Sequence, residues 1–97
     1  MKYNPYNIDI KFTNEIFEKQ CLNKMSMNDI SNILKKHKDV SITSICLENL
    51  CSSSDPATIK AIIKKYDTKV TMKCVKNAIA KDWSKNYICY LFLLAYN

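Results

Sequence analysis

The sequence contains no glycine and only two prolines. Sheet-rich folds use glycine for turns that require positive φ, so its absence favours helices joined by short connections. Arginine is absent too, and all 15 basic residues are lysines. Because arginine is the side chain that binds guanine and phosphate in a bidentate manner, its absence argues against a sequence-specific reader of nucleic acid.

Long apolar runs are also missing. The longest, at 87–96, has half the length of a bilayer span, and the first residues alternate between polar and apolar side chains, unlike a signal peptide. The five cysteines are an odd number at irregular spacings, which is a poor disulfide framework. We therefore expect a reduced, intracellular, cytoplasmic protein without a membrane partner.

The residue patterns of enzymes and metal sites are not found either. Without glycine there is no phosphate-binding loop, and the acidic residues are scattered along the chain. His37 is the only histidine and falls at the end of an expected helix, where it suits a structural role. The spacing of Cys46 and Cys51 does not suit zinc, so we expect the cysteines to be small buried side chains. The sequence predicts no catalytic residue, metal or cofactor.

What the sequence does contain is an apolar pattern that occurs three times, at a period of about 29 residues. It reads ISNILKKH at 30–37, IKAIIKKY at 59–66 and ICYLFLLA at 88–95. Four residues before these segments stand Ser26, Asp55 and Ser84, which are all good helix N-caps. The pattern predicts a helix after each of the three.

A second set of helix starts lies about 13 residues upstream, in FTNEIFE, ITSICLE and VTMKCVK. Thr13, Thr43 and Thr71 are the expected N-caps, and the apolar residues around each form a hydrophobic staple. The 97 residues, carrying a net charge of +6, thus read as one domain of repeated helix pairs. Its expected parts are an N-terminal arm at 1–11 and repeats at 12–37, 42–66 and 70–97.

The initial threonine, the Ile-x-x-Leu/Ile-Leu/Ile stretch of the second helix and the connector in ILKKHKDVS together resemble the ankyrin repeat. The similarity is to the degenerate, Ile/Asn/Lys-rich repeats of large DNA viruses and some protists, and it covers residues 12–96. Only the threonine of the Thr-Pro-Leu-His signature is present, and the period is shorter than the standard one of about 33. The resemblance implies an all-α fold, a short solenoid of three stacked helix-turn-helix repeats, with a generic helical solenoid as the alternative. It also implies a non-enzymatic protein-protein interaction module.

Two surfaces are candidates for binding another molecule. Connectors escape the constraints of a packed core, so a protein partner is expected there. The connector residues are Lys38, Asp39, Ser41, Asp67, Thr68 and Lys69. The alternative is weakly specific binding of nucleic acid or an acidic surface along a lysine-rich edge, which otherwise is a solvated face. The residues of this edge are Lys35, Lys36, Lys60, Lys64 and Lys65.

A third candidate is the last helix, which is apolar on almost every side. Such a helix is normally buried, so we expect a second copy of the chain, another protein or a further repeat to cover it. The alternative cover is the N-terminal arm, through Tyr3, Tyr6, Ile8 and Ile10. The expected self-association residues are Trp83, Tyr87, Cys89, Tyr90, Leu91, Phe92, Leu94 and Tyr96.

Overall fold

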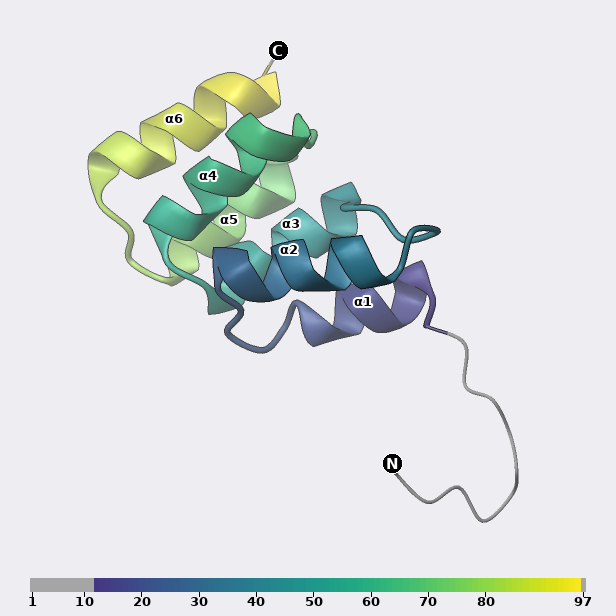
Figure 1. The fold of residues 1–97 in the computed structure, drawn as a ribbon. Coiled ribbons are helices and arrows are strands. Elements are labelled where there is room, and N and C mark those ends of the chain that lie inside the picture. The colour runs from purple at the N-terminus through teal and green to yellow at the C-terminus, as the bar shows by residue number, and fades with distance from the viewer. Residues whose placement is uncertain (1–11, 97) are drawn as a thin grey trace.

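The structure, a computed structural model, describes residues 12–96, and this part of the chain contains six α-helices and no strand (Figure 1). The helices are α1 (Asn14–Gln20), α2 (Met27–Lys36), α3 (Ser44–Ser53), α4 (Pro56–Tyr66), α5 (Met72–Ala80) and α6 (Lys85–Tyr96). The predicted all-α class is confirmed. The expected N-terminal arm, with its four apolar side chains, lies outside the described residues.

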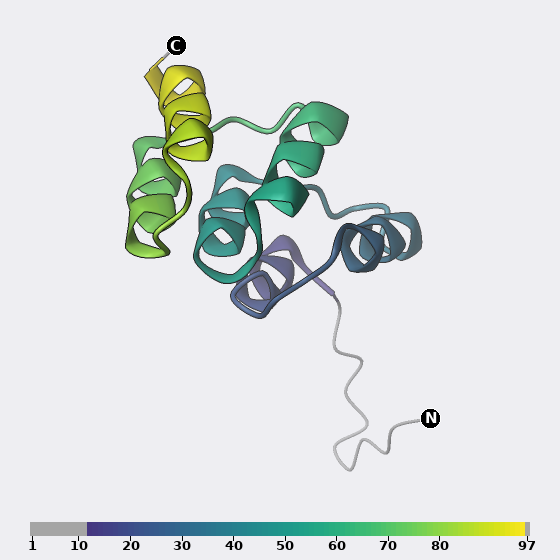
Figure 2. The same ribbon diagram turned by 90° about the vertical axis from the view of Figure 1, so that its left-hand side faces the viewer.

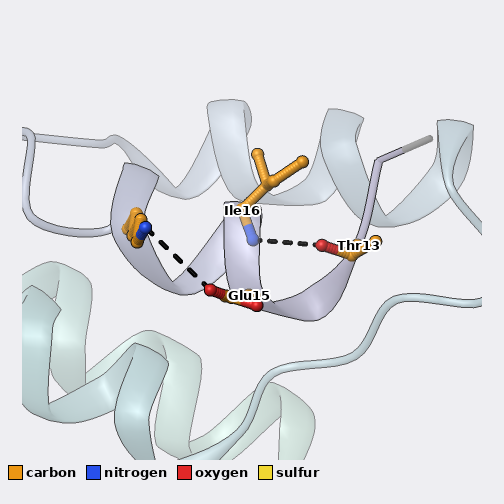
Figure 3. Close-up of polar contacts among 4 residues, drawn as sticks. Thr13, Glu15 and Ile16 are labelled. Atoms are coloured by element: carbon orange, nitrogen blue, oxygen red, sulfur yellow. Dashed lines mark hydrogen bonds and ion pairs between the residues drawn. The ribbon is translucent and has the colours of Figure 1, made fainter. Parts of the chain in front are cut away.

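Four helices begin at the side-chain caps that the sequence predicts. The hydroxyl of Thr13 accepts a hydrogen bond from the backbone N–H of Ile16 at 3.3 Å, and Figure 3 shows this bond at the start of α1. Figure 3 also shows the exposed Glu15 carboxylate, whose ion pair with Lys19 at 4.0 Å contributes little in water. The other three caps, at the starts of α2, α3 and α4, are Ser26, Thr43 and Asp55.

The last two helices begin where expected, and α5 does so without a side-chain cap bond. Thr71 is the N-cap residue of α5, yet its side chain accepts no bond from the helix amides. Helix α6 starts directly after Ser84, whose backbone carbonyl accepts from the N–H of Ile88 at 3.1 Å. The predicted helix starts are therefore confirmed, whereas the side-chain cap predicted for Thr71 is wrong.

Aspartate replaces glycine where a helix ends in the left-handed conformation. Asp67, after α4, has φ 50°, and Asp82, after α5, has φ 58°. Around Asp82 the N–H of Trp83 donates to the carbonyl of Ala78, and the N–H of Asp82 donates to that of Ile79. These two bonds form a Schellman motif, in which glycine is the usual left-handed residue. Aspartate tolerates this conformation better than most residues, so the chain can end these helices without glycine.

Three helices form a row with α3 in the middle. Helix α3 packs against α1 on one side and α5 on the other, and Figures 1 and 2 both show this order. Helices α2, α4 and α6 form a second layer, in which α4 packs on α3 and α6 packs on α5. The core between the layers is apolar, and its largest fully buried side chains include Phe17, Ile30, Leu47, Leu50, Ile59, Ile62 and Leu91.

Polar side chains of α3 fasten it to α1. The Thr43 hydroxyl donates to the carboxylate of Glu18 at 2.7 Å, and the Asn49 amide donates to the backbone carbonyl of Glu18, also at 2.7 Å. One turn further along α3, the hydroxyl of Ser53 donates to the backbone carbonyl of Cys21 at 2.6 Å. Since these three donors are spaced along one face of α3, that face must lie against residues 18–21.

The same contacts recur between α5 and α3. The Thr71 hydroxyl donates to the Glu48 carboxylate at 2.6 Å, and the Asn77 amide donates to the Glu48 carbonyl at 2.8 Å. Glu48 thus accepts from Thr71 and Asn77 the same two bonds that Glu18 accepts from Thr43 and Asn49. Helix α3 contributes donors to one neighbour and acceptors to the other.

The second layer is linked by fewer contacts. The hydroxyl of Ser54 donates to the carbonyl of Met25 at 3.1 Å and accepts from its N–H at 3.4 Å. Ser54 is buried and occupies the position where an apolar staple residue would precede α4. A buried polar bridge to Met25 therefore stands where an apolar staple residue would otherwise precede α4.

Candidate interaction surface

One face of α6 presents apolar side chains to solvent. Phe92 is 43% exposed, Leu93 64% and Tyr96 79%, and Cys89 is exposed as well. Their spacing of three, four and seven residues from Cys89 places all four on one side of a helix. We call these four residues the α6 stripe. The residues from 86 to 96 include no charged side chain, so the α6 stripe is both apolar and neutral.

The opposite face of α6 is covered by the chain itself. Leu91 is 1% exposed, and Trp83, just before the helix, is 9% exposed. Tyr87 is partly buried and its ring meets the Trp83 ring edge-on, with centroids 6.5 Å apart. Leu91 and Trp83 therefore belong to the core and are not available for self-association, contrary to the sequence-based expectation. The helix itself packs on α5.

The remaining residues of the expected set divide between these two faces. Tyr90 is partly buried, with the ammonium group of Lys60 5.2 Å from its ring centroid. Leu94 is 37% exposed and borders the α6 stripe. Leu93 was not in the expected set, although it is the most exposed aliphatic side chain on α6. Its spacing from Cys89 could have identified it.

The connector residues are exposed with one exception. Five of them face solvent, namely Lys38, Asp39, Ser41, Asp67 and Lys69. Thr68 is only 9% exposed, and its hydroxyl has no hydrogen-bond partner among the described residues. It stands two residues before Val70, as Val40 stands two residues before Ile42, so it takes the place of a core valine. Thr68 is therefore not a surface contact residue.

The lysine edge follows the C-terminal ends of α2 and α4. Lys35, Lys36, Lys64 and Lys65 are exposed, whereas Lys60 is half-buried over Tyr90. The Nζ of Lys65 lies 3.5 Å from the hydroxyl of Ser31 on α2. Because Lys35 is one turn beyond Ser31, the lysines of the two helices share one side of the molecule. Helix C-termini attract cations, which accounts for part of this arrangement without a ligand.

Four of the five cysteines are buried, and only Cys89 is exposed. The buried four form two pairs. The hydrogen bond to Cys46, together with burial, raises the pKa of the Cys21 thiol, and the same bond lowers the pKa of Cys46 to about 6. In the second pair the bond to Cys74 and burial raise the pKa of Cys51, while the pKa of Cys74 falls to about 7. Sequence reasoning missed this pairing.

The other chemical groups of the described residues are engaged in structural contacts. The ring of His37 stacks on Phe12, with centroids 4.2 Å apart. Within residues 12–96 no cluster of histidine, cysteine and acidic side chains could hold a metal ion. A cavity of about 300 Å³ lies at the N-termini of α2 and α4, but the polar side chains there include helix caps. Its lining residues are Lys24, Met25, Ser26, Asp29, Asp55 and Thr58.

None of the helices described between residues 12 and 96 is both long enough and apolar enough to span a bilayer.

Comparison with known proteins identifies no relative. The chain matches no protein-family model, no curated protein and no solved structure.

Proposed function

We propose that this chain is a non-enzymatic protein-protein interaction module that binds a second copy of itself through the α6 stripe. The observation that carries the proposal is the exposure of Phe92, Leu93 and Tyr96 on one side of a helix whose other side is buried. Apolar side chains gathered in one exposed patch mark interaction sites more often than single exposed ones do. Aromatic residues are also the usual anchors of protein interfaces.

The absence of charge on the α6 stripe favours a second copy over an acidic partner. The chain carries a net charge of +6, so two copies repel one another over most of their surface. From residue 86 to 96 there is no charge to repel, and two such faces can meet without burying an unpaired ion. An acidic partner would instead be drawn to the lysine edge on α2 and α4.

The architecture we propose for the module is a short ankyrin-like solenoid of three stacked helix pairs. It is supported by the recurrence of two hydrogen bonds, Thr43 and Asn49 to Glu18 and then Thr71 and Asn77 to Glu48. It is also supported by the common spacing of the starts of α2, α4 and α6. Short stacks of this kind act through surfaces built from successive repeats.

Sedimentation equilibrium over a wide range of protein concentration tests self-association. We expect a monomer–dimer equilibrium for the unmodified chain and a monomer for Leu93→Glu, because the substitution would bury a charge in the interface. The matched control is Ile45→Glu, which makes the same kind of change at a side chain 50% exposed on α3. We expect this control to dimerise like the unmodified chain.

If the unmodified chain is a monomer at high micromolar concentration, the proposal is contradicted. Equal weakening by Leu93→Glu and Ile45→Glu would show that the dimer does not form through α6. A native circular dichroism spectrum for both variants establishes that the substitutions act on association rather than on folding.

The second candidate function is weakly specific binding of nucleic acid or another polyanion by the lysine edge. It is favoured by one observation, the shared side of Lys35 on α2 and Lys65 on α4. Binding through such lysines releases counterions, so it should weaken steeply as salt rises. Fluorescence anisotropy with a random-sequence oligonucleotide measures this.

Two double variants test this second function. One changes Lys64 and Lys65 on α4 to alanine, and the other changes Lys73 and Lys76 on α5, so that both lose the same charge. Only the first should reduce binding if the edge is the site. Equal losses, or binding that survives about 0.3 M salt, would contradict it.

A further inference from the structure

We propose that Cys21 with Cys46, and Cys51 with Cys74, are two oxidisable dithiol sites. Each reacts with a hydroperoxide to form a disulfide between neighbouring helices of the row α1, α3 and α5. The inference is independent of self-association, because all four thiols are fully buried and none of them belongs to α6.

Hydrogen bonds made by residues on either side of Cys46 place it against Cys21. Thr43 and Asn49, three residues before and after Cys46 on α3, both bond to Glu18. Ser53, one helical turn beyond Asn49, bonds to the carbonyl of Cys21 itself. Cys46 therefore lies on the face of α3 that covers residues 18–21. The pKa values of Cys21 and Cys46 shift in opposite directions, each through the other thiol, which agrees with this placement.

The second pair repeats this geometry one helix further along the row. Thr71 and Asn77, three residues before and after Cys74 on α5, both bond to Glu48. Cys51 follows Glu48 by three residues, as Cys21 follows Glu18. Cys74 and Cys51 thus meet across the α3–α5 contact. The recurrence makes a chance encounter of two thiols a poor explanation.

The surroundings of each pair favour one thiol as the nucleophile. The hydroxyl of Thr43 lies 3.3 Å from the sulfur of Cys46, and that of Thr71 lies 3.6 Å from the sulfur of Cys74. The larger effect comes from the partner thiol. A hydrogen bond from Cys21 favours the thiolate of Cys46, and one from Cys51 favours that of Cys74, and the thiolate is the reactive form of cysteine. In agreement, the pKa values of Cys46 and Cys74 fall to about 6 and about 7, whereas those of their partners rise.

The reaction at each pair consumes one hydroperoxide molecule. The thiolate of Cys46 attacks one oxygen of hydrogen peroxide, the O–O bond breaks, and hydroxide leaves to take up a proton as water. The resulting sulfenic acid is then attacked by the thiol of Cys21, which forms the S–S bond and releases a second water. Two sulfurs are oxidised and the peroxide is reduced. Cys74 and Cys51 react in the same way.

Burial determines the rate of this reaction. Peroxide reaches the four fully buried thiols only when the helices open locally, so oxidation should be slower at the pairs than at the exposed Cys89. Once formed, each disulfide closes a loop of the chain and restricts the unfolded state. The oxidised protein should therefore melt at a higher temperature, by on the order of 10 °C for each pair.

The test uses the full chain with Cys89→Ser, which removes the exposed thiol and any link between copies. The reduced protein is incubated with hydrogen peroxide, its free thiols are alkylated, and intact mass and proteolytic peptides are measured. We expect the loss of two hydrogen atoms for each pair, and cross-linked peptides that join Cys21 to Cys46 and Cys51 to Cys74. The melting temperature should rise in the same samples and return on reduction.

Cys46→Ser in the same background provides the matched comparison. It should lose the first cross-link and keep the second, and half of the rise in melting temperature should remain. Should Cys46→Ser fail to fold, Cys21→Ser removes the same pair, and the peptide map of the parent protein decides the matter without either variant. Three outcomes would overturn the proposal. The four thiols could all remain available for alkylation, the protein could gain oxygen atoms instead of losing hydrogen atoms, or the cross-links could join other pairs of cysteines.

Discussion

The hydroxyl of Thr71 donates to the carboxylate of Glu48 at 2.6 Å and does not cap the helix that Thr71 begins. Thr43 does both, since its hydroxyl donates to Glu18 at 2.7 Å and accepts from the N–H of Cys46 at 3.3 Å. Two threonines at matching places in the sequence thus share the contact between helices but not the cap. The difference can be measured.

We expect Thr71→Ala to lower the free energy of unfolding by about 1.5–3 kcal/mol, because it removes a hydrogen bond to a charged group. In a Glu48→Ala background the same change should cost no more than about 0.5 kcal/mol. Thr43→Ala in a Glu18→Ala background should still cost about 1 kcal/mol, because the cap remains. Urea denaturation of the two double-mutant cycles measures both. Equal residual costs would show that the two threonines have the same role.

The unpartnered hydroxyl of Thr68 predicts a stabilising substitution. Thr68→Val replaces the hydroxyl by a methyl group of similar shape and should raise the free energy of unfolding by about 1 kcal/mol. Thr68→Ser is the comparison, since it keeps the hydroxyl and removes the methyl group, and it should destabilise. Thermal and chemical denaturation of the pair provide the measurement. A loss of stability in Thr68→Val would mean that the hydroxyl has a partner.

Asp82 predicts opposite effects for two substitutions at one position. Its φ of 58° suits glycine, so Asp82→Gly should stabilise the chain by up to about 1 kcal/mol. Asp82→Val places a β-branched side chain in the left-handed region and should destabilise it by about 1–2 kcal/mol. Urea denaturation of both variants tests this order. Equal stabilities would indicate that the residue after α5 does not hold this conformation.

Asp55 predicts a pH dependence at the start of α4. Hydrogen bonds from Thr58, made to the N-cap side chain, lower the pKa of Asp55 below its ordinary value. A carboxylate with a lowered pKa stabilises the fold above its unfolded pKa, and the contribution is lost as pH falls through the folded value. Asp55→Ala should cost about 0.5–2 kcal/mol at pH 7 and less at pH 3. Urea denaturation of Asp55→Ala and of the parent protein at pH 7 and pH 3 measures this difference in stability. An equal difference at the two pH values would contradict the prediction.

The starts of the helices could be predicted from the sequence because capping is local chemistry. Ser26 needs only a helix amide three residues away, and that distance is fixed by the helix itself. The same is true of Thr43 and Asp55. Residues whose partners are near in the chain can be identified from spacing alone.

The pairs of cysteines could not be predicted in this way. Cys21 and Cys46 are brought together by the packing of α1 on α3, and neither residue has a local partner that signals the other. The positions of Glu18 and Glu48, both five residues after a threonine, were the available hint. Only the structure shows that these glutamates face the next threonine along the chain.

Thr68 was misplaced for a different reason. Threonine and valine have nearly the same shape, so a threonine in a connector reads as polar even when it fills the site of a valine. The α6 stripe was predicted only in part, because a helix that is apolar on every side does not reveal which face its neighbours cover. Leu91 and Leu93 look equivalent in the sequence and differ completely in exposure.

The contacts of helix α3 indicate which segment of the chain could be duplicated to lengthen the protein. Helix α3 alone among the described helices carries both halves of the contact, with Thr43 and Asn49 facing α1 and Glu48 facing α5. On α5 the position of Glu48 is taken by Lys76, and on α1 the position of Asn49 is taken by Lys19. A second copy of residues 43–70 could therefore pack on the first through these same contacts. A tandem duplication of that segment should lengthen the protein by one helix pair, whereas duplicated copies of the flanking segments would present lysine where the contact requires glutamate or asparagine.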